Sequence, residues 1–173
     1  GDSGDRFGCS VAISGDTAVV GARGYGFGSA YVFQWGGTAW KQIAKLTASD
    51  EAKYDYFGHS VAIDGNTIVV GAYGDDDSGS YSGSAYVFQR NGATWNQTAK
   101  LTAHDGYTSD LFGYSVAISG TTAIVGAYLD DDNGESSGSA YLFDTTTGQQ
   151  IAKLLPDDGA AGDGLGRSVA ISG

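Results

Sequence analysis

The sequence predicts an all-β protein, a β-propeller of four-stranded antiparallel blades, with about three blades and the first strand of a fourth in its 173 residues. One pattern recurs with a period of 50 to 55 residues, which is typical of propeller blades. Each unit contains four short runs rich in Val, Ile, Tyr and Phe, separated by turn residues, and no helix-period segment competes with them. The predicted units are residues 1–50, 51–105 and 106–158, followed by the single strand within 159–173.

The first two runs of each unit are predicted to form an antiparallel hairpin. Their residues are mostly Ser, Ala, Gly and Val, which suits the crowded region near a propeller axis. Gly-containing turns at 14–16 and 64–66 join the two runs, as expected for hairpins. The first run, "FGCSVAIS" in unit one, starts at Phe7, Phe57, Phe112 and Leu165, and the second, "VVGA" or "IVGA", ends at Ala22, Ala72 and Ala127.

The third and fourth runs are predicted to complete each blade. The third, "GSAYVF" or "GSAYLF", places a Tyr and a Phe on one face at the same positions of every unit, so we expect these aromatic residues to pack between blades. The fourth run ends in "AKL" and alternates, so we expect its lysines to reach water at an outer edge, where charge blocks edge-to-edge pairing. The lysines are Lys45, Lys100 and Lys153.

Composition excludes several classes of partner. With 41% apolar residues the chain can form a core, and its net charge of −11 disfavours nucleic acids and anionic membrane surfaces. No apolar run approaches the roughly 18 residues of a spanning helix, so we expect no membrane insertion in this segment. The sequence opens on Gly1 and contains no Met, so we expect it to be part of a longer or processed polypeptide. Three blades do not close a ring, and either further blades of a longer chain or identical copies would supply the rest.

The runs "FG", "SVAI", "VVGA" and "SAYVF", in this order, resemble the FG-GAP repeat family across essentially the whole chain. The likeness is to the bacterial secreted or surface type of these integrin-α-like propeller repeats. It implies a non-enzymatic, extracellular or cell-surface module for adhesion or ligand binding. In integrin-type repeats a calcium loop lies between the "FG" and "GAP" strands. Here that place holds short turns with at most one carboxylate, too few oxygens for calcium, so that site is not carried over.

Acidic loops follow the second run instead, in units two and three. Their alternating carboxylates partly fit the pattern of a calcium loop, but the Gly of the sharp turn is misplaced. Unit one has no carboxylate there. Two interpretations stay open, a calcium site or a solvated acidic turn, and calcium is the one candidate cofactor. The candidate metal ligands are Asp75, Asp77, Asp130 and Asp132.

Other polar residues favour architecture over catalysis. An Asp stands two residues before the Phe or Leu of each "FG" or "LG", at Asp5, Asp55, Asp110 and Asp163, and is predicted to accept backbone N–H groups in the blade connection. His59 occupies a variable position of the repeat, and we expect it to be exposed. The chain has two histidines, no pair at metal-ligand spacing and no G-x-S-x-G element, so we expect no enzyme.

Aromatic residues in or beside loops are the predicted contact surface. Tyr and Trp suit stacking on sugars and anchoring of proteins. We therefore expect a protein or glycan ligand, with copies of the chain itself as the alternative partner in a polymerising surface layer or filament. The candidate contact residues are Tyr25, Trp35, Tyr73, Tyr81 and Tyr128.

Overall fold

A computed structural model describes residues 4–24 and 26–173. Its twelve strands form three separate four-stranded antiparallel sheets, so the all-β prediction is confirmed. Within the described ranges no helix is long and apolar enough to span a membrane. The strands are β1 (Arg6–Ser14), β2 (Thr17–Arg23), β3 (Ser29–Trp35), β4 (Trp40–Leu46), β5 (Ser60–Asp64), β6 (Thr67–Ala72), β7 (Ser84–Asn91), β8 (Thr94–Leu101), β9 (Ser115–Ser119), β10 (Thr122–Ala127), β11 (Ser139–Asp144) and β12 (Gln150–Leu154).

Each sheet is one predicted unit, with its strands paired in chain order. The two-residue turns after the first strands favour this order, because so short a turn leaves the next strand no partner but its neighbour. The second and third strands pair across longer loops, such as 73–83. Gly15 and Gly65, in the first turns of blades one and two, have φ of 53° and 51°, which favours glycine. The pairing of the third and fourth strands slips by one residue just before the repeated Phe33, Phe88 and Phe143.

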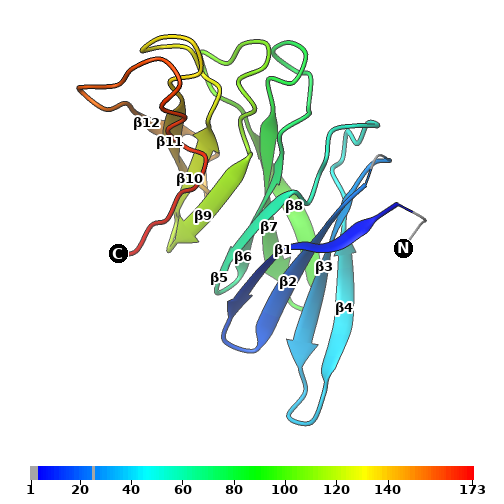
Figure 1. Cartoon of the computed structure of the whole chain (residues 1–173). Helices are drawn as coiled ribbons and strands as arrows, with labels where there is room; N and C mark the ends of the chain where they lie inside the picture. The colour runs from blue at the N-terminus through cyan, green and yellow to red at the C-terminus, as the bar shows by residue number, and fades with distance from the viewer. Residues whose placement is uncertain (1–3, 25) are drawn as a thin grey trace.

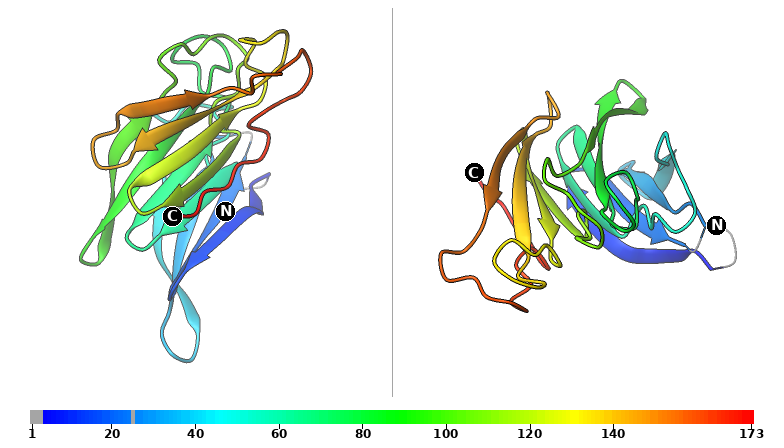
Figure 2. Two further views of the ribbon diagram at one scale, coloured as in Figure 1. Left: turned by 90° about the vertical axis from the view of Figure 1, so that its left-hand side faces the viewer. Right: turned by 90° about the horizontal axis from the view of Figure 1, so that it is seen from above.

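The three sheets fan out as adjacent blades (Figures 1 and 2). The first strands β1, β5 and β9 contact one another in succession. One end of the fan carries the hairpin turns after the first and third strands of each blade. The other end carries the described residues of the loops after the second strands, 24, 26–28, 73–83 and 128–138, together with the connections between blades. We call these the hairpin end and the loop end.

The core lies between blades. Phe57 at the start of the second blade is fully buried, and its ring lies 5.4 Å from that of Tyr86 and 6.0 Å from that of Phe88. The same cluster includes Val19 and Val32 of the first blade. Phe112 repeats this packing between blades two and three. The predicted packing role of the Tyr and Phe on the third strands is confirmed for the second and third blades.

A glycine-on-glycine contact joins each blade to the next. Ser10 Oγ donates a hydrogen bond of 3.0 Å to the Gly58 carbonyl, and a Cβ on Gly21 would lie 2.0 Å from the same oxygen. The "FG" glycine of the following blade therefore explains both residues, because its carbonyl oxygen accepts the hydrogen bond of the Ser of "SVAI" and leaves no room for a side chain on the Gly of "VGA". We call this trio the interblade lock. It recurs as Ser60, Gly71 and Gly113 and as Ser115, Gly126 and Gly166.

The segment expected to be the first strand of a fourth blade is not a strand in the structure. Residues 155–173 form turns and one isolated bridge, between Leu165 and Gly138. Its "LG" still completes the third lock. The physical reason is that a β-strand needs a hydrogen-bonded neighbour, and among the described residues this segment pairs only through the bridge between Leu165 and Gly138.

Candidate functional site

The buried Asp75 organises the acidic loop of the second blade. Its Oδ1 accepts the Ser84 hydroxyl at 2.9 Å and the Asp77 N–H at 3.2 Å, and its Oδ2 accepts the Tyr86 hydroxyl at 2.9 Å. Only 4% of Asp75 is exposed. A carboxylate held this far from water requires a cation as well as hydrogen bonds.

Lys100 on β8 supplies that cation. Its Nζ lies 3.0 Å from Asp75, 2.7 Å from Asp50 and 2.6 Å from Asp77, measured to Oδ2 in each case. Although burial opposes both shifts, these hydrogen bonds raise the pKa of Lys100 above its ordinary value and lower that of Asp50. The expectation that this lysine reaches water is therefore wrong. Its charge is drawn inward by three carboxylates.

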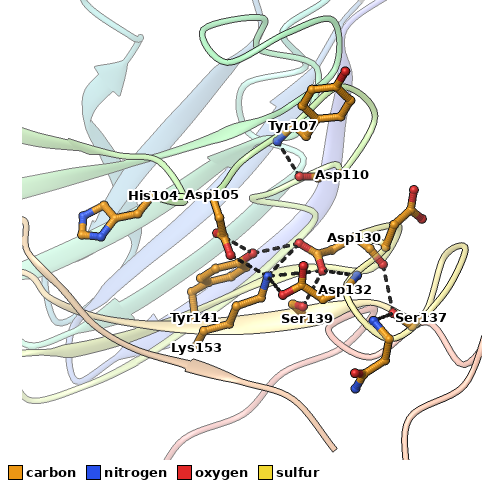
Figure 3. Close-up of polar contacts among 12 residues, drawn as sticks. His104, Asp105, Tyr107, Asp110, Asp130, Asp132, Ser137, Ser139, Tyr141 and Lys153 are labelled. Atoms are coloured by element: carbon orange, nitrogen blue, oxygen red, sulfur yellow. Dashed lines mark hydrogen bonds and ion pairs between the residues drawn. The ribbon is translucent and has the colours of Figure 1, made fainter.

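The third blade repeats the cluster (Figure 3). Lys153 Nζ lies 3.1 Å from the buried Asp130, 2.7 Å from Asp105 and 2.5 Å from Asp132. Tyr141 donates to Asp130 at 2.9 Å. Burial opposes ionisation of Asp130, but its hydrogen bonds from Ser139, Lys153 and Tyr141 outweigh burial and lower its pKa. In the first blade, whose loop has no acid, the equivalent Lys45 is exposed as predicted and its Nζ lies 5.9 Å from the ring centre of Tyr31.

The carboxylates of Asp50, Asp75 and Asp77 lie close enough together to hold a metal ion. The ammonium of Lys100, however, already lies among them, 2.6 to 3.0 Å from one oxygen of each carboxylate, so a metal ion would have to displace it. We therefore describe these sites as lysine-centred acidic clusters. The predicted residues Asp75, Asp77, Asp130 and Asp132 all belong to them. Sequence reasoning missed Asp50 and Asp105, although an Asp five residues after the repeated lysine was visible in the repeat.

The Asp before "FG" or "LG" caps a turn in the blade connection at three of its four positions. Asp55 Oδ2 accepts the Ala52 N–H at 2.7 Å, and Asp110 Oδ2 accepts the Tyr107 N–H at 2.6 Å. Asp163 makes the same bond to Ala160 at 2.8 Å. The predicted structural role is confirmed at these three positions. Burial raises the pKa of Asp55 and of Asp110 to about 6.

These raised pKa values lead to a prediction for the double variant Asp55→Asn, Asp110→Asn. Its stability relative to that of the wild type should increase as pH rises. A carboxyl whose folded pKa is raised from 3.8 to about 6 stabilises the fold fully below pH 3.8 and loses that contribution as pH rises through 6. Asn keeps the acceptor oxygen but never becomes charged. The difference in melting temperature, variant minus wild type, should therefore be larger at pH 7 than at pH 4. Asp163→Asn, in the exposed copy of the turn, is the control, and a difference that does not change with pH would contradict the prediction.

Variable positions of the repeat converge at the loop end. The residue after "FG" and the residue after "GA" differ between blades, yet their side chains touch across blades. The ring of His59 lies 4.7 Å from that of Tyr73 and 4.6 Å from that of Tyr114, and the rings of Tyr114 and Tyr128 are 4.4 Å apart. We call these four residues the aromatic row. Its ends are Arg23, which donates to the Tyr73 hydroxyl at 2.9 Å, and Arg167, whose guanidinium carbon lies 5.6 Å from the Tyr128 ring centre.

His59 is half-buried within this row, so the expectation that it is exposed is wrong. Burial, with a smaller contribution from the charge of Arg23, lowers the pKa of His59 to about 4. Its imidazole is therefore neutral at physiological pH. The ring acts here as a packing group between two tyrosines.

The predicted contact residues fall at different places. The structure brings together Tyr73 and Tyr128, through Tyr114, which sequence reasoning left out. Tyr81 is 38% exposed on the loop before β7, also at the loop end. Trp35 packs on Trp40 with ring centres 5.7 Å apart, at the hairpin end. Tyr25 lies outside the described residues.

Comparisons with known proteins agree with this architecture. Among solved structures, a europium-containing methanol dehydrogenase matches with a TM-score of 0.55 and 12% identity, over 88% of this chain and 28% of that one. Sqt1 of Saccharomyces cerevisiae matches with a TM-score of 0.55 and 14% identity, over 92% of this chain and 38% of that one. This chain therefore spans well under half of either structure, and at such identities the likeness shows the propeller fold alone. No curated protein sequence matches.

The family comparison is more specific than the structural one. The model of the FG-GAP repeat matches residues 1–33, 40–88, 95–143 and 149–173. These four matches contain the "FG" and "GA" glycines that form the three interblade locks. The chain belongs to the FG-GAP repeat family.

Proposed function

We propose that the chain is a non-catalytic module of an extracellular or cell-surface protein, and that it binds a protein or glycan through the loop end of its blades. Family and fold support a binding or structural module. One observation carries the choice of surface. Positions that architecture holds constant lie in the locks and the core, whereas positions that differ between blades meet in the aromatic row. Folding of a repeat does not require its residues to vary from blade to blade. Variation that gathers at one surface therefore supports a role of that surface in recognition.

The row is suited to recognition because its aromatic groups are held rigidly. Tyr73, Tyr114 and Tyr128 are half-buried, and each ring contacts at least one neighbouring ring. Rigid tyrosines lose little conformational entropy on binding and expose both an apolar ring and a hydroxyl. Such residues commonly dominate the binding energy of interfaces.

A second candidate function is assembly with other blades, as a structural subunit. The outer face of the first blade is apolar and exposed where the second blade's equivalent face is buried. Exposed fractions are 58%, 70% and 64% for Phe7, Val11 and Ile13, against 0%, 8% and 8% for Phe57, Val61 and Ile63. Exposed apolar faces of this kind mark contact surfaces. A further blade, from the same polypeptide or from another copy, could cover this face, because the equivalent face of the second blade is covered by the first blade.

Binding to a printed array of neutral and acidic glycans and to a panel of secreted proteins tests the proposal, with native mass measured in parallel. We expect a discrete particle that binds a member of the panel. Tyr114→Ser, at the centre of the row, should weaken binding about tenfold or more, the loss typical of an interface hot spot. Trp40→Ser, at the hairpin end, is the matched control and should bind as the wild type does. Filaments that bind nothing in the panel would favour the structural subunit instead.

A further inference from the structure

A small cavity opens at the loop end between the first and second blades. Its volume is about 180 Å³, and the described residues that line it are Arg6, Arg23, Gly24, Tyr56 and Tyr73. Sites for drug-sized molecules usually enclose about 300 to 1,000 Å³. This cavity therefore admits a small ion or one group of a larger ligand.

The two arginines depart from the repeat at adjacent points. Arg6 stands where the second and third blades have Tyr56 and Leu111, and Arg23 stands where they have Tyr73 and Tyr128. Those blades form the same strands and the same locks without an arginine at either position, so the architecture does not require one. The chain has four arginines, and these two share one cavity in a protein of net charge −11.

The guanidinium of Arg23 has unused hydrogen-bonding capacity. Its Nη1 donates to the Tyr73 hydroxyl, while its Nε is buried and has no hydrogen-bond partner. In the described part of the chain, no carboxylate forms an ion pair with Arg23. A guanidinium carries five N–H donors arranged to match an oxyanion. The charge and the vacant donors together favour an anionic ligand.

The cavity wall and a nearby acid define the ligand further. The rings of Tyr56 and Tyr73 are stacked, 4.9 Å apart and 16° from parallel, and form a rigid aromatic wall. Aromatic walls favour ligands with an apolar face next to the charge, as a sugar ring has. The carboxylate of Asp5 borders Gly24, because a Cβ on that glycine would lie 2.7 Å from Asp5 Oδ1. Its negative charge opposes anion binding.

We propose that this cavity binds the carboxylate of an acidic sugar residue within a glycan, with Arg23 pairing the carboxylate, the positive charge of Arg6 adding to the attraction and the Tyr56–Tyr73 wall contacting the ring. The inference rests on the proposed binding function and adds the chemical class of the ligand. A free oxyanion such as phosphate shares the charge but has no ring. The arms of the experiment distinguish these two sources.

Calorimetric titration with trigalacturonate, its uncharged methyl ester and inorganic phosphate tests the proposal. We expect trigalacturonate to bind at least tenfold more tightly than the ester or phosphate. Arg23→Gln should weaken trigalacturonate binding about tenfold or more, the usual effect of losing a hydrogen bond to a charged group. Arg23→Lys should fall between wild type and Arg23→Gln, and Asp5→Asn should tighten binding. Arg90→Gln, whose side chain bonds at the hairpin end, is the matched control.

Three outcomes would overturn both the anion site and its assignment to an acidic sugar. They are equal binding of acid and ester, binding of trigalacturonate that Arg23→Gln and Arg6→Gln leave unchanged, and no binding of either anion. Phosphate binding as tightly as trigalacturonate, with the same dependence on Arg23, would support the anion site and reject the sugar as its source. A ligand from the panel that depends on Tyr114 and not on Arg23 would leave the proposed function standing while the acidic-sugar site falls. Thermal melting of each variant separates lost binding from lost folding.

Discussion

Gly71→Ala is expected to destabilise the fold by about 3 kcal/mol or more, at the upper end of overpacking costs, because the added methyl group meets backbone. Its Cβ would lie 2.0 Å from the carbonyl oxygen of Gly113 and 2.2 Å from Ser60 Oγ. Relief requires the second and third blades to separate along the whole lock. The separation would also break the hydrogen bond of 2.8 Å from Ser60 to Gly113. Urea unfolding followed by circular dichroism measures the loss.

Gly26→Ala is the matched control for this substitution. A Cβ there meets nothing within 4 Å, and the backbone of Gly26 is not in the left-handed region. We expect it to change the free energy of unfolding by less than about 0.5 kcal/mol, as surface substitutions usually do. Equal stability of the two variants would mean that the blades are not joined by close glycine contacts.

The fold was predictable because its signals are local. Runs such as 60–64 and 67–72 are rich in β-branched residues, and the short turn between them leaves few alternatives for pairing. The interblade lock was not predictable from one repeat, since Ser60 and Gly113 are 53 residues apart and meet only when the blades stack. Repetition of both residues at one spacing showed that they matter, but not that they touch.

The candidate sites were predictable only in part, for two different reasons. The orientation of the Lys100 side chain depends on the acidic loop. Alternation along β8 predicts which face of the sheet carries this lysine, but it does not predict the carboxylates that the lysine meets there. The aromatic row depends on comparing positions across blades. Tyr73 and Tyr128 occupy the position of Arg23, and His59 that of Tyr114, so the row was visible as two aligned variable positions. The location of these tyrosines in loops does not by itself indicate the row, because only their alignment between blades does.

Lys100→Met is expected to lower stability by about 3 to 5 kcal/mol, the usual loss when one partner of a buried ion pair is removed. The methionine fills the space of the lysine stem but leaves the buried Asp75 carboxyl without its ammonium partner, with Asp50 and Asp77 close by. Adding Asp75→Asn should restore part of the stability, because the uncompensated charge is then gone. The first blade shows that a blade forms without these acids. Thermal and urea unfolding at pH 7 measure both variants, and Lys45→Met, at the exposed equivalent position, is the control.

The same variant decides between a lysine-centred cluster and a calcium site. Removing the ammonium leaves three carboxylates whose oxygens lie within metal-binding distance of one another. A ligand that binds only the folded state raises its stability, by about 2.7 kcal/mol at 100 times its Kd. Millimolar calcium should therefore raise the melting temperature of chelator-treated Lys100→Met and leave that of the wild type unchanged, because in the wild type calcium must first displace a paired lysine. A wild type stabilised by calcium as strongly as the variant would show that the acidic loops bind metal despite Lys100, and Asp77→Ala should then abolish the effect.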